Sequence, residues 1–301
     1  MKVPFIKYSK VWLAIGVITA VAGLAALVGW GFKYGIDFTG GSLMELRFTA
    51  NRPAVAEVQE VFAEHDLANA LVQTSGAENA IIRTAFLTEA KHQEILTALR
   101  KRFEKESQTI REERFETIGA AVSKQLRERS LWALILVSLS IIAYVAIAFR
   151  KISRPIASWK YGTIAIVTLL YVVIVVSGIF AALGRWRGVE VDIAFVVAIL
   201  TVLGYSVNDS IVVYDRIREN LLRHRIDNFG ELVNTGLNET LARSVNTVFA
   251  VLLPLVALYF FGGPTIHYFA LALILGMAMS TWASIFIASP LLVLVERWQR
   301  K

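Results

Sequence analysis

The chain has 301 residues, of which 56% are hydrophobic and 18% charged, and its mean hydropathy is +0.57. Soluble globular proteins carry about 25% charged residues, so this composition excludes an ordinary water-soluble protein. The formal net charge of +7 lies outside residues 33–129, which hold 15 acidic and 14 basic side chains, a net charge of −1. Nucleic-acid binders usually concentrate basic charge on a soluble domain or tail, so no nucleic-acid partner is expected. The absence of cysteine excludes disulfides and thiolate metal sites.

Several apolar stretches with at most one charged residue are long enough to cross a bilayer, which takes about 20 apolar residues in a helix. The first four lie at residues 11–32, 130–149, 161–184 and 193–214. Asp209 is the one charge within them. Between Arg243 and Glu296 a further 52 positions carry no Asp, Glu, Lys or Arg, which leaves room for two spans around a turn at Gly262-Gly263-Pro264. The sequence therefore predicts six transmembrane helices.

Basic residues predict the orientation of these spans, because Lys and Arg are enriched on the cytoplasmic side. They gather in the tail at residues 1–10, after the second and fourth spans, and at the C-terminus, whereas the two short connections on the other side hold only Arg185 and Arg187. Both termini are therefore expected in the cytoplasm and residues 33–129 outside. Ala20-Val21-Ala22 resembles a signal-peptide cleavage site, but the apolar run continues for ten residues beyond it, which favours an uncleaved anchor.

The polar region at residues 33–129 is expected to form an α+β domain. Its elements are a strand at Ser42–Phe48, a helix from Pro53 to Asp66 capped by Asn51, strands at Ala70–Thr74 and Ala80–Ala85 around Ser75-Gly76, a helix capped by Thr88, and a strand at Thr109–Ile118. The order strand, helix, strand, strand, helix, strand is that of a ferredoxin-like βαββαβ domain. His65 and His92 lie in polar helical surroundings and are interpreted as solvated surface residues.

A glycine-rich segment, Gly35-Ile36-Asp37-Phe38-Thr39-Gly40-Gly41, follows the first span directly. One interpretation is a turn at the membrane exit, with glycines that adopt positive φ and with Asp37 bonded to nearby amides. The other is a hinge, formed by Gly35, Asp37, Gly40 and Gly41, that couples the first span to the outer domain. Composition alone favours the turn.

Asp209 is the residue most indicative of function. It lies six positions before Asp215, about 9 Å inside the predicted cytoplasmic end of the fourth span. Insertion scales give a cost of about 2.5–3.5 kcal/mol for an unpaired charge at the centre of a span, so a partner, water or a proton is expected. A titrating carboxyl group on a wet seam is what a proton relay requires. The alternative is an interfacial residue of a shorter span that faces cytoplasmic water.

The neighbours of Asp209 support the relay hypothesis. Tyr205 precedes it by four residues, and Ser206 precedes Ser210 by the same spacing. Gly204 and Asn208 share a face, where glycine would allow close helix packing and Asn208 a hydrogen bond across it. Arg243, at the start of the fifth span, is either an ordinary positive-inside anchor or an ion-pair partner for Asp209 that opens on protonation.

The segment 215–240 between the fourth and fifth spans is polar, with apolar residues spaced along it. Cytoplasmic amphipathic helices along the membrane surface would account for this pattern. The remainder of residues 130–301 is assigned to a five-helix membrane bundle.

These features together resemble the SecF family of bacterial SecD–SecF protein-export complexes, within the resistance-nodulation-division superfamily. The resemblance covers essentially the whole chain. It is carried by Gly35–Gly41, by Gly204–Asp209 with its continuation to Asn220, and by Phe261-Gly262-Gly263-Pro264.

The resemblance implies a bacterial inner-membrane protein that pairs with SecD and associates with the SecYEG channel and YajC. It would use the proton-motive force to help complete the export of preproteins, with Asp209 as the membrane aspartate and Arg243 as the functional arginine. No cofactor or metal is expected. No Walker loop, HExxH, nucleophile elbow or pair of catalytic carboxylates occurs, so an enzyme is not expected.

Two other functions stay open from the sequence. One is export of small molecules or lipids by a transporter of the same superfamily, although six spans are half of the usual twelve and the outer domain is small. The other is a passive scaffold of the export complex.

Overall fold

The computed structural model describes residues 3–50, 52–75, 77–105, 108–148, 158–223 and 228–299. The chain folds into two compact units, a polar one of residues 34–130 and a helical one formed by the chain up to Lys33 and from Leu131 onward. Within the described residues, six helices are long and apolar enough to cross a membrane, which confirms the predicted number. The chain is therefore a multi-pass membrane protein.

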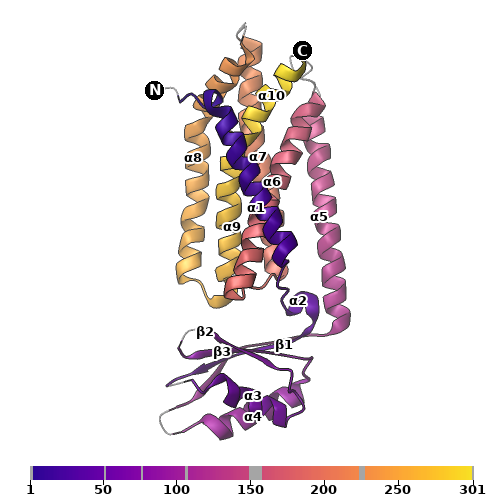
Figure 1. Ribbon diagram of the computed structural model, residues 1–301, viewed down its shortest axis with the longest axis vertical. Coiled ribbons are helices and arrows are strands. Elements are labelled where there is room, and N and C mark those ends of the chain that lie inside the picture. The colour runs from indigo at the N-terminus through magenta and orange to yellow at the C-terminus, as the bar shows by residue number, and fades with distance from the viewer. Residues whose placement is uncertain are drawn as a thin grey trace. The chain divides into compact units, whose positions relative to one another are not determined.

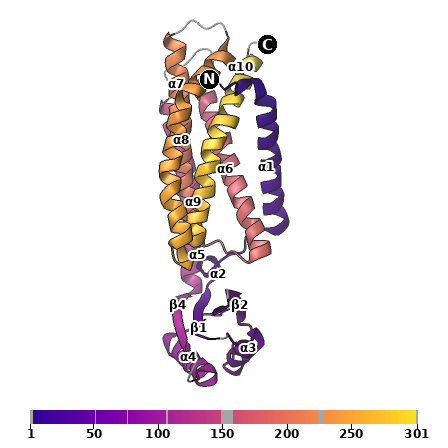
Figure 2. The same cartoon turned by 90° about the vertical axis from the view of Figure 1, so that its left-hand side faces the viewer.

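The helical unit is a bundle whose helices run side by side (Figures 1 and 2). Its elements are α1 (Ser9–Trp30), the membrane part of α5 (Ala120–Ala148), α6 (Ser158–Arg187), α7 (Ile193–Arg223), α8 (Phe229–Phe261), α9 (Pro264–Ala283), a π-helical turn (Ser284–Ala288) and α10 (Ser289–Gln299). A short 3-10 helix, Ile6–Tyr8, precedes α1. The two termini lie at the same end of the bundle (Figure 1).

Glycines allow close contacts between helices of the bundle. A Cβ atom added to Gly178 of α6 would lie 2.4 Å from the Cα atom of Gly23 in α1. One added to Gly276 of α9 would lie 2.2 Å from a side-chain carbon of Val202 in α7. Because lipid tails are as apolar as leucine, membrane helices associate through such close packing rather than through the hydrophobic effect.

Large apolar side chains cover the outside of the bundle. Val28 of α1 is 82% exposed, and Phe260 and Phe261 at the end of α8 are 71% and 90% exposed. The outer surface of a membrane protein meets lipid, so these side chains need no protein cover. Buried polar side chains such as Thr168, Ser177 and Ser280 lie inside the bundle.

The polar unit contains one four-stranded antiparallel sheet in the order β2-β3-β1-β4. Along the chain, a short helix α2 (Ile36–Thr39) is followed by β1 (Gly41–Phe48), α3 (Val55–Glu64), β2 (Leu71–Ser75), β3 (Asn79–Thr84), α4 (Glu89–Phe103) and β4 (Ile110–Ile118). Helices α3 and α4 cover the same face of the sheet (Figure 1). This order and sheet topology confirm the predicted ferredoxin-like βαββαβ fold.

A hydrophobic core lies between this sheet and the two helices. Met44, Leu46 and Phe48 alternate along β1 and are fully buried against Phe62 of α3 and Leu99 of α4. The alternation follows from the two-residue repeat of a strand, which places every second side chain on one face. The unit therefore owes its stability to the usual burial of apolar surface away from water.

Helix α3 begins differently from the prediction. Its N-cap is Ala54, so Pro53 lies before the helix, and Asn51 lies outside the described residues. The carboxylate of Glu57 accepts a hydrogen bond from the Ala54 amide at 3.0 Å, which supplies the missing polar cap from within the first turn. The predicted cap Thr88 is confirmed for α4, where its hydroxyl accepts a hydrogen bond from the Lys91 amide. Gly76, at the predicted hairpin turn, lies outside the described residues.

The interpretation of His92 as a solvated residue is wrong. The side chain is buried, and the imidazole ring stacks on Phe115 with the ring centroids 3.6 Å apart. Its two nitrogens face Glu112 at 2.5 Å and Glu89 at 3.3 Å. Glu89 is a polar neighbour of His92 in the sequence, whereas Glu112 comes from β4, so the polar surroundings of His92 in the sequence do not indicate exposure.

Residues 215–240 form no separate helix in the described part of the chain. Asp215–Arg223 is the end of α7, and residues 229–240 are the beginning of α8. Phe229, Leu232 and Val233 are buried within the protein, whereas Leu222 is 79% exposed. The apolar residues at the start of α8 therefore pack against protein.

Candidate functional site

Asp209 lies on the face of α7 that is buried inside the bundle. Its side chain is 6% exposed, and Ser206 and Ser210 on the same face are 1% and 3% exposed. The carboxylate oxygen Oδ2 forms no hydrogen bond with any described residue. A buried, unpaired carboxylate in a low-dielectric environment costs several kcal/mol, so its charge state depends strongly on what its neighbours supply.

Two hydroxyl groups from other helices lie close enough to interact with the Asp209 carboxyl group. They belong to Ser244 of α8 and Thr281 of α9, which are 3% and 6% exposed. Neither hydroxyl forms a hydrogen bond with a described residue, so both remain able to donate or accept one. Three helices therefore bring one carboxyl and two hydroxyl groups to a single buried position.

Further hydroxyl groups lie buried and unpaired within the described residues. Ser206 of α7, Ser280 of α9 and Ser284 of the π-helical turn have no hydrogen-bond partner there, and the same holds for the Tyr205 hydroxyl, which interacts electrostatically with Thr281 and Asp209. Buried hydroxyls are normally hydrogen-bonded, so unpaired ones call for a specific explanation. Hydroxyl groups both accept and donate hydrogen bonds, which suits them to pass a proton to or from a carboxyl group.

The π-helical turn Ser284–Ala288 interrupts the last membrane helix and begins at Ser284, three residues after Thr281. A π-helix widens the backbone by one residue per turn and commonly occurs at functional sites. Sequence reasoning missed Ser244, Thr281, Ser280 and Ser284. A signal existed, since Ser280 and Ser284 share a helix face in a stretch with no charged residue.

Arg243 does not form an ion pair with Asp209 in this structure. It is exposed on α8, whereas the next residue, Ser244, is buried and faces the carboxyl group. Successive residues of a helix are rotated by about 100°, so the two side chains cannot both point at α7. No described residue forms a salt bridge with Arg243.

Gly204 and Asn208 share a face of α7, as expected, and that face is exposed. No described atom would lie within 4 Å of a Cβ atom at Gly204, so no helix in the described part of the chain packs closely there. Instead, both residues line a cavity of about 390 Å³ that is bounded on the other side by Val137, Ser140, Ile141 and Tyr144 of α5. A close contact between helix backbones lies instead at Gly23 and Gly178, which the sequence pattern does not single out.

The glycine-rich segment has the geometry of a turn. Gly40 and Gly41 adopt φ angles of 75° and 112°, which favour glycine, whereas Gly35 has a φ of −74° and caps α2. Asp37 lies in the first turn of α2. A Cβ atom at Gly41 would lie 2.6 Å from the carbonyl oxygen of Thr84, so the pairing of β1 with β3 also requires glycine at this position.

Comparison with known proteins places the chain in a family. A family model described as "Protein export membrane protein SecD/SecF, C-terminal" matches residues 98–298, and the "SecD/SecF GG Motif" matches residues 26–51. The chain belongs to the SecF family. The "Protein translocase subunit SecF" of Thermobaculum terrenum is 39% identical over 99% of this chain and 95% of that protein.

Two relatives are longer than this chain. The "Protein translocase subunit SecDF" of Brucella abortus is 35% identical over 97% of this chain but only 37% of its own length. The crystal structure of SecDF from Thermus thermophilus, titled a translocon-associated membrane protein, matches with 31% identity and a TM-score of 0.82. It covers 100% of this chain, which spans 39% of the length of that protein. The SecF family thus accounts for the whole fold, and the chain has a role in Sec-pathway protein export.

Proposed function

We propose that this chain is a proton-motive-force-dependent accessory subunit of the Sec protein translocase, which promotes late steps of preprotein export across the bacterial inner membrane. Membership of the SecF family and the six membrane helices support this proposal. The observation that carries it is the buried Asp209 carboxyl group, whose Oδ2 atom lacks a hydrogen-bond partner among the described residues. In this proposal the subunit is no enzyme and needs no cofactor.

Protonation of Asp209 is the step that couples the proton gradient to movement. The ionised carboxylate attracts the hydroxyl groups of Ser244 and Thr281 as donors, whereas the protonated carboxyl group can itself donate a hydrogen bond. The two states therefore favour different packing of α7 against α8 and α9. Moving one charge through 100 mV supplies about 2.3 kcal/mol, enough to shift such an equilibrium about fiftyfold.

Gly204 and Asn208 of α7, beside the hollow that α5 bounds, and the exposed Arg243 of α8 are proposed to contact SecD. A polar face with a cation is costly against lipid, and a neighbouring protein would remove that cost. The SecDF relatives contain, in one chain, much sequence beyond the part that matches this protein. In this arrangement Arg243 and Asn208 join the proton relay from the SecD side, whereas Asp209, Tyr205 and Ser206 belong to the interior.

Gly35, Asp37, Gly40 and Gly41 are proposed as the hinge through which the first span moves the polar unit. The positive φ angles of Gly40 and Gly41 and the short helix α2 support a compact turn in this part of the chain. The charge asymmetry of the loops supports cytoplasmic termini and a periplasmic position for the polar unit. There it would meet preproteins that emerge from SecYEG, with YajC as a further component of the assembly.

The test is an Asp209→Asn substitution, which keeps the shape of the side chain but cannot ionise. The assay uses inner-membrane vesicles that contain SecYEG, SecD and this chain. We expect the part of the export rate that depends on the proton gradient to be at least about tenfold lower for the variant than for the wild type. Asp215→Asn is the matched control, because Asp215 lies six residues further along α7 with a side chain 70% exposed. It should change that rate by less than about twofold.

Assembly must be measured in the same vesicles. If Asp209→Asn supports the normal gradient-dependent rate while SecD is still bound, the proton-relay proposal is wrong and a passive scaffold becomes the better description. The proton-relay and scaffold proposals both predict that the polar unit crosslinks to emerging preprotein. An exporter of small molecules or lipids would give no such crosslink.

A further inference from the structure

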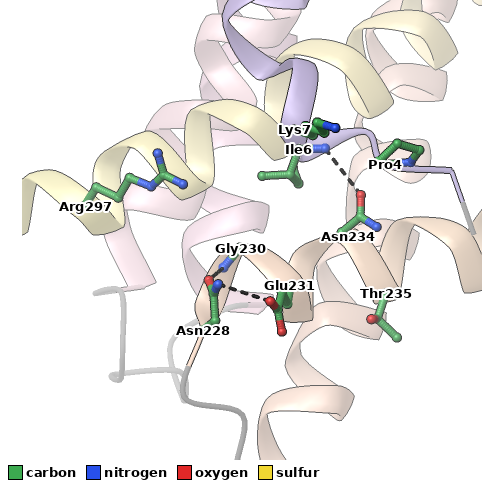
Figure 3. Close-up of a pocket in the computed structure, with 9 residues that line it drawn as sticks. All are labelled: Pro4, Ile6, Lys7, Asn228, Gly230, Glu231, Asn234, Thr235 and Arg297. Atoms are coloured by element: carbon green, nitrogen blue, oxygen red, sulfur yellow. Dashed lines mark hydrogen bonds between the residues drawn. The ribbon is translucent and has the colours of Figure 1, made fainter.

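A second hollow lies at the end of the bundle that carries both termini. It is a pocket of about 400 Å³ between the N-terminal segment, the beginning of α8 and the end of α10 (Figure 3). Ile6 and Lys7 line it from the N-terminal segment, Glu231 and Asn234 from α8, and Arg297 from α10. Its volume is in the range of pockets that bind small molecules. It shares no residue with the site around Asp209.

Hydrogen bonds fix the wall formed by the N-terminal segment. The side chain of Asn238 accepts a hydrogen bond from the amide of Val3 at 2.7 Å and donates one to the carbonyl of Val3 at 2.9 Å. The Asn234 side chain accepts a hydrogen bond from the Ile6 amide at 3.3 Å (Figure 3). Phe5 is buried and packs edge-on against Phe286. The pocket is therefore formed before any ligand enters, which lowers the entropic cost of binding.

The pocket carries two cations that form no ion pair with a described residue, Lys7 and Arg297. Glu231 is the one acidic residue in the lining, and its carboxylate accepts a hydrogen bond from Asn228 at 3.4 Å. The lining therefore has a net charge of +1. The first amides of α8 do not contribute, because Asn228 already accepts hydrogen bonds from the amides of Gly230 and Glu231. Attraction for an anion comes from the two basic side chains.

The surroundings of the pocket are those of a membrane–water interface. Tyr8, beside Lys7, is 50% exposed, and Trp298, beside Arg297, is 86% exposed. Exposed Tyr and Trp next to Lys and Arg are typical of the level of lipid headgroups. Leu294, one turn before Trp298 on α10, is 53% exposed and continues the apolar surface toward the bilayer. A ligand in the pocket would therefore lie at the height of the headgroups.

We propose that this pocket binds the headgroup of an anionic phospholipid, with the phosphodiester between Lys7 and Arg297 and the acyl chains along α10. A phosphodiester carries one negative charge, which matches the net charge of the lining. Inorganic phosphate carries between one and two negative charges at neutral pH, and Glu231 opposes the charge beyond the first. Bound lipid would link the N-terminal segment to α8 and α10.

The experiment is a titration of the full chain, purified in detergent, with phosphatidylglycerol, and bound lipid is counted by native mass spectrometry. Phosphatidylcholine and inorganic phosphate are the other two arms. Each basic residue near an anionic membrane contributes about 1 kcal/mol, so Lys7→Gln or Arg297→Gln should weaken phosphatidylglycerol binding about fivefold, and the double variant about thirtyfold. Glu231→Gln should strengthen it.

Lys10→Gln is the matched control, because Lys10 is exposed in the first turn of α1, three residues after Lys7, but lies outside the pocket. It should change binding by less than twofold. If Lys10→Gln weakens binding as much as the pocket variants do, general surface charge explains the effect and the pocket proposal is overturned. Displacement of the lipid by equimolar inorganic phosphate would show a site for free anions, and equal binding of phosphatidylcholine would show no selectivity for anionic lipid. Either result also overturns it.

Discussion

The two units of this protein place their polar groups in opposite ways. In the polar unit, apolar side chains such as Phe62 are buried and a buried histidine, His92, has two carboxylate partners. In the membrane bundle, apolar side chains such as Phe261 lie outside, and the Oδ2 atom of Asp209 and the hydroxyl group of Thr281 are buried without hydrogen-bond partners among the described residues. Within the polar unit, the buried imidazole of His92 finds its partners. In the bundle, a buried group without a partner costs free energy because lipid offers no hydrogen bonds, so Asp209 and its hydroxyl neighbours are the groups most indicative of a function.

The largest difference between the units should appear when one phenylalanine is removed from each. Phe62→Ala deletes a fully buried side chain from the core of the polar unit and should cost about 3–5 kcal/mol. Phe261→Ala removes a side chain that is 90% exposed on α8 and should cost less than about 1 kcal/mol.

Denaturation in detergent can measure the Phe62 effect locally. Because the chain has no cysteine, a Thr97→Cys substitution on the exposed side of α4 gives a unique site for a fluorescent label in the polar unit. Amide hydrogen exchange in α8 measures the loss of stability that Phe261→Ala causes in the bundle. Equal losses of stability from the two substitutions would contradict the proposed difference between the units.

Glycines of the bundle provide a second, smaller test. Gly178→Val places side-chain atoms against the backbone of Gly23 and should destabilise the contact of α1 with α6 by about 1–3 kcal/mol. Gly204→Val enters open space in this chain and should leave the thermal unfolding midpoint of the purified protein almost unchanged.

The same pair of variants also tests the proposed SecD surface. Gly204→Val should weaken copurification with SecD, whereas Gly178→Val acts on stability. Normal SecD binding by Gly204→Val would show that this face of α7 does not contact SecD.

The smallest expected effect concerns a buried carboxylate of the polar unit, Glu45. Burial raises its pKa above the ordinary value of 4.5, while the charge of Arg114 opposes this shift. The ionised form is therefore less favourable in the folded state. The contribution of Glu45 to the free energy of unfolding is greatest below pH 4.5, falls as the pH rises through 4.5 towards the folded-state pKa of Glu45, and is constant at higher pH.

Glu45→Gln removes this pH dependence. The variant should match the wild type near pH 4 and be more stable at pH 7, as followed by the label at Thr97→Cys. A variant that is less stable than the wild type at pH 7 would show that the contact with Arg114 outweighs the cost of burial.

The sequence by itself determined the features that depend on local pattern and length. Uncharged runs gave the six membrane helices, the order of alternating and helical segments gave the βαββαβ domain, and the single charge in the fourth span marked Asp209. A membrane span needs about 20 apolar residues, and the side chains of a strand alternate between its two faces every two residues. Both patterns can be recognised within a single segment of the sequence.

Only the tertiary structure decided which side chains meet. It brings Ser244 and Thr281 to Asp209, turns Arg243 outward, and buries His92 between two glutamates. These outcomes depend on the rotation of each helix about its axis, and one residue changes that rotation by about 100°. That rotation is set by packing between segments far apart in the chain, such as Gly23 against Gly178, so no local pattern reveals it.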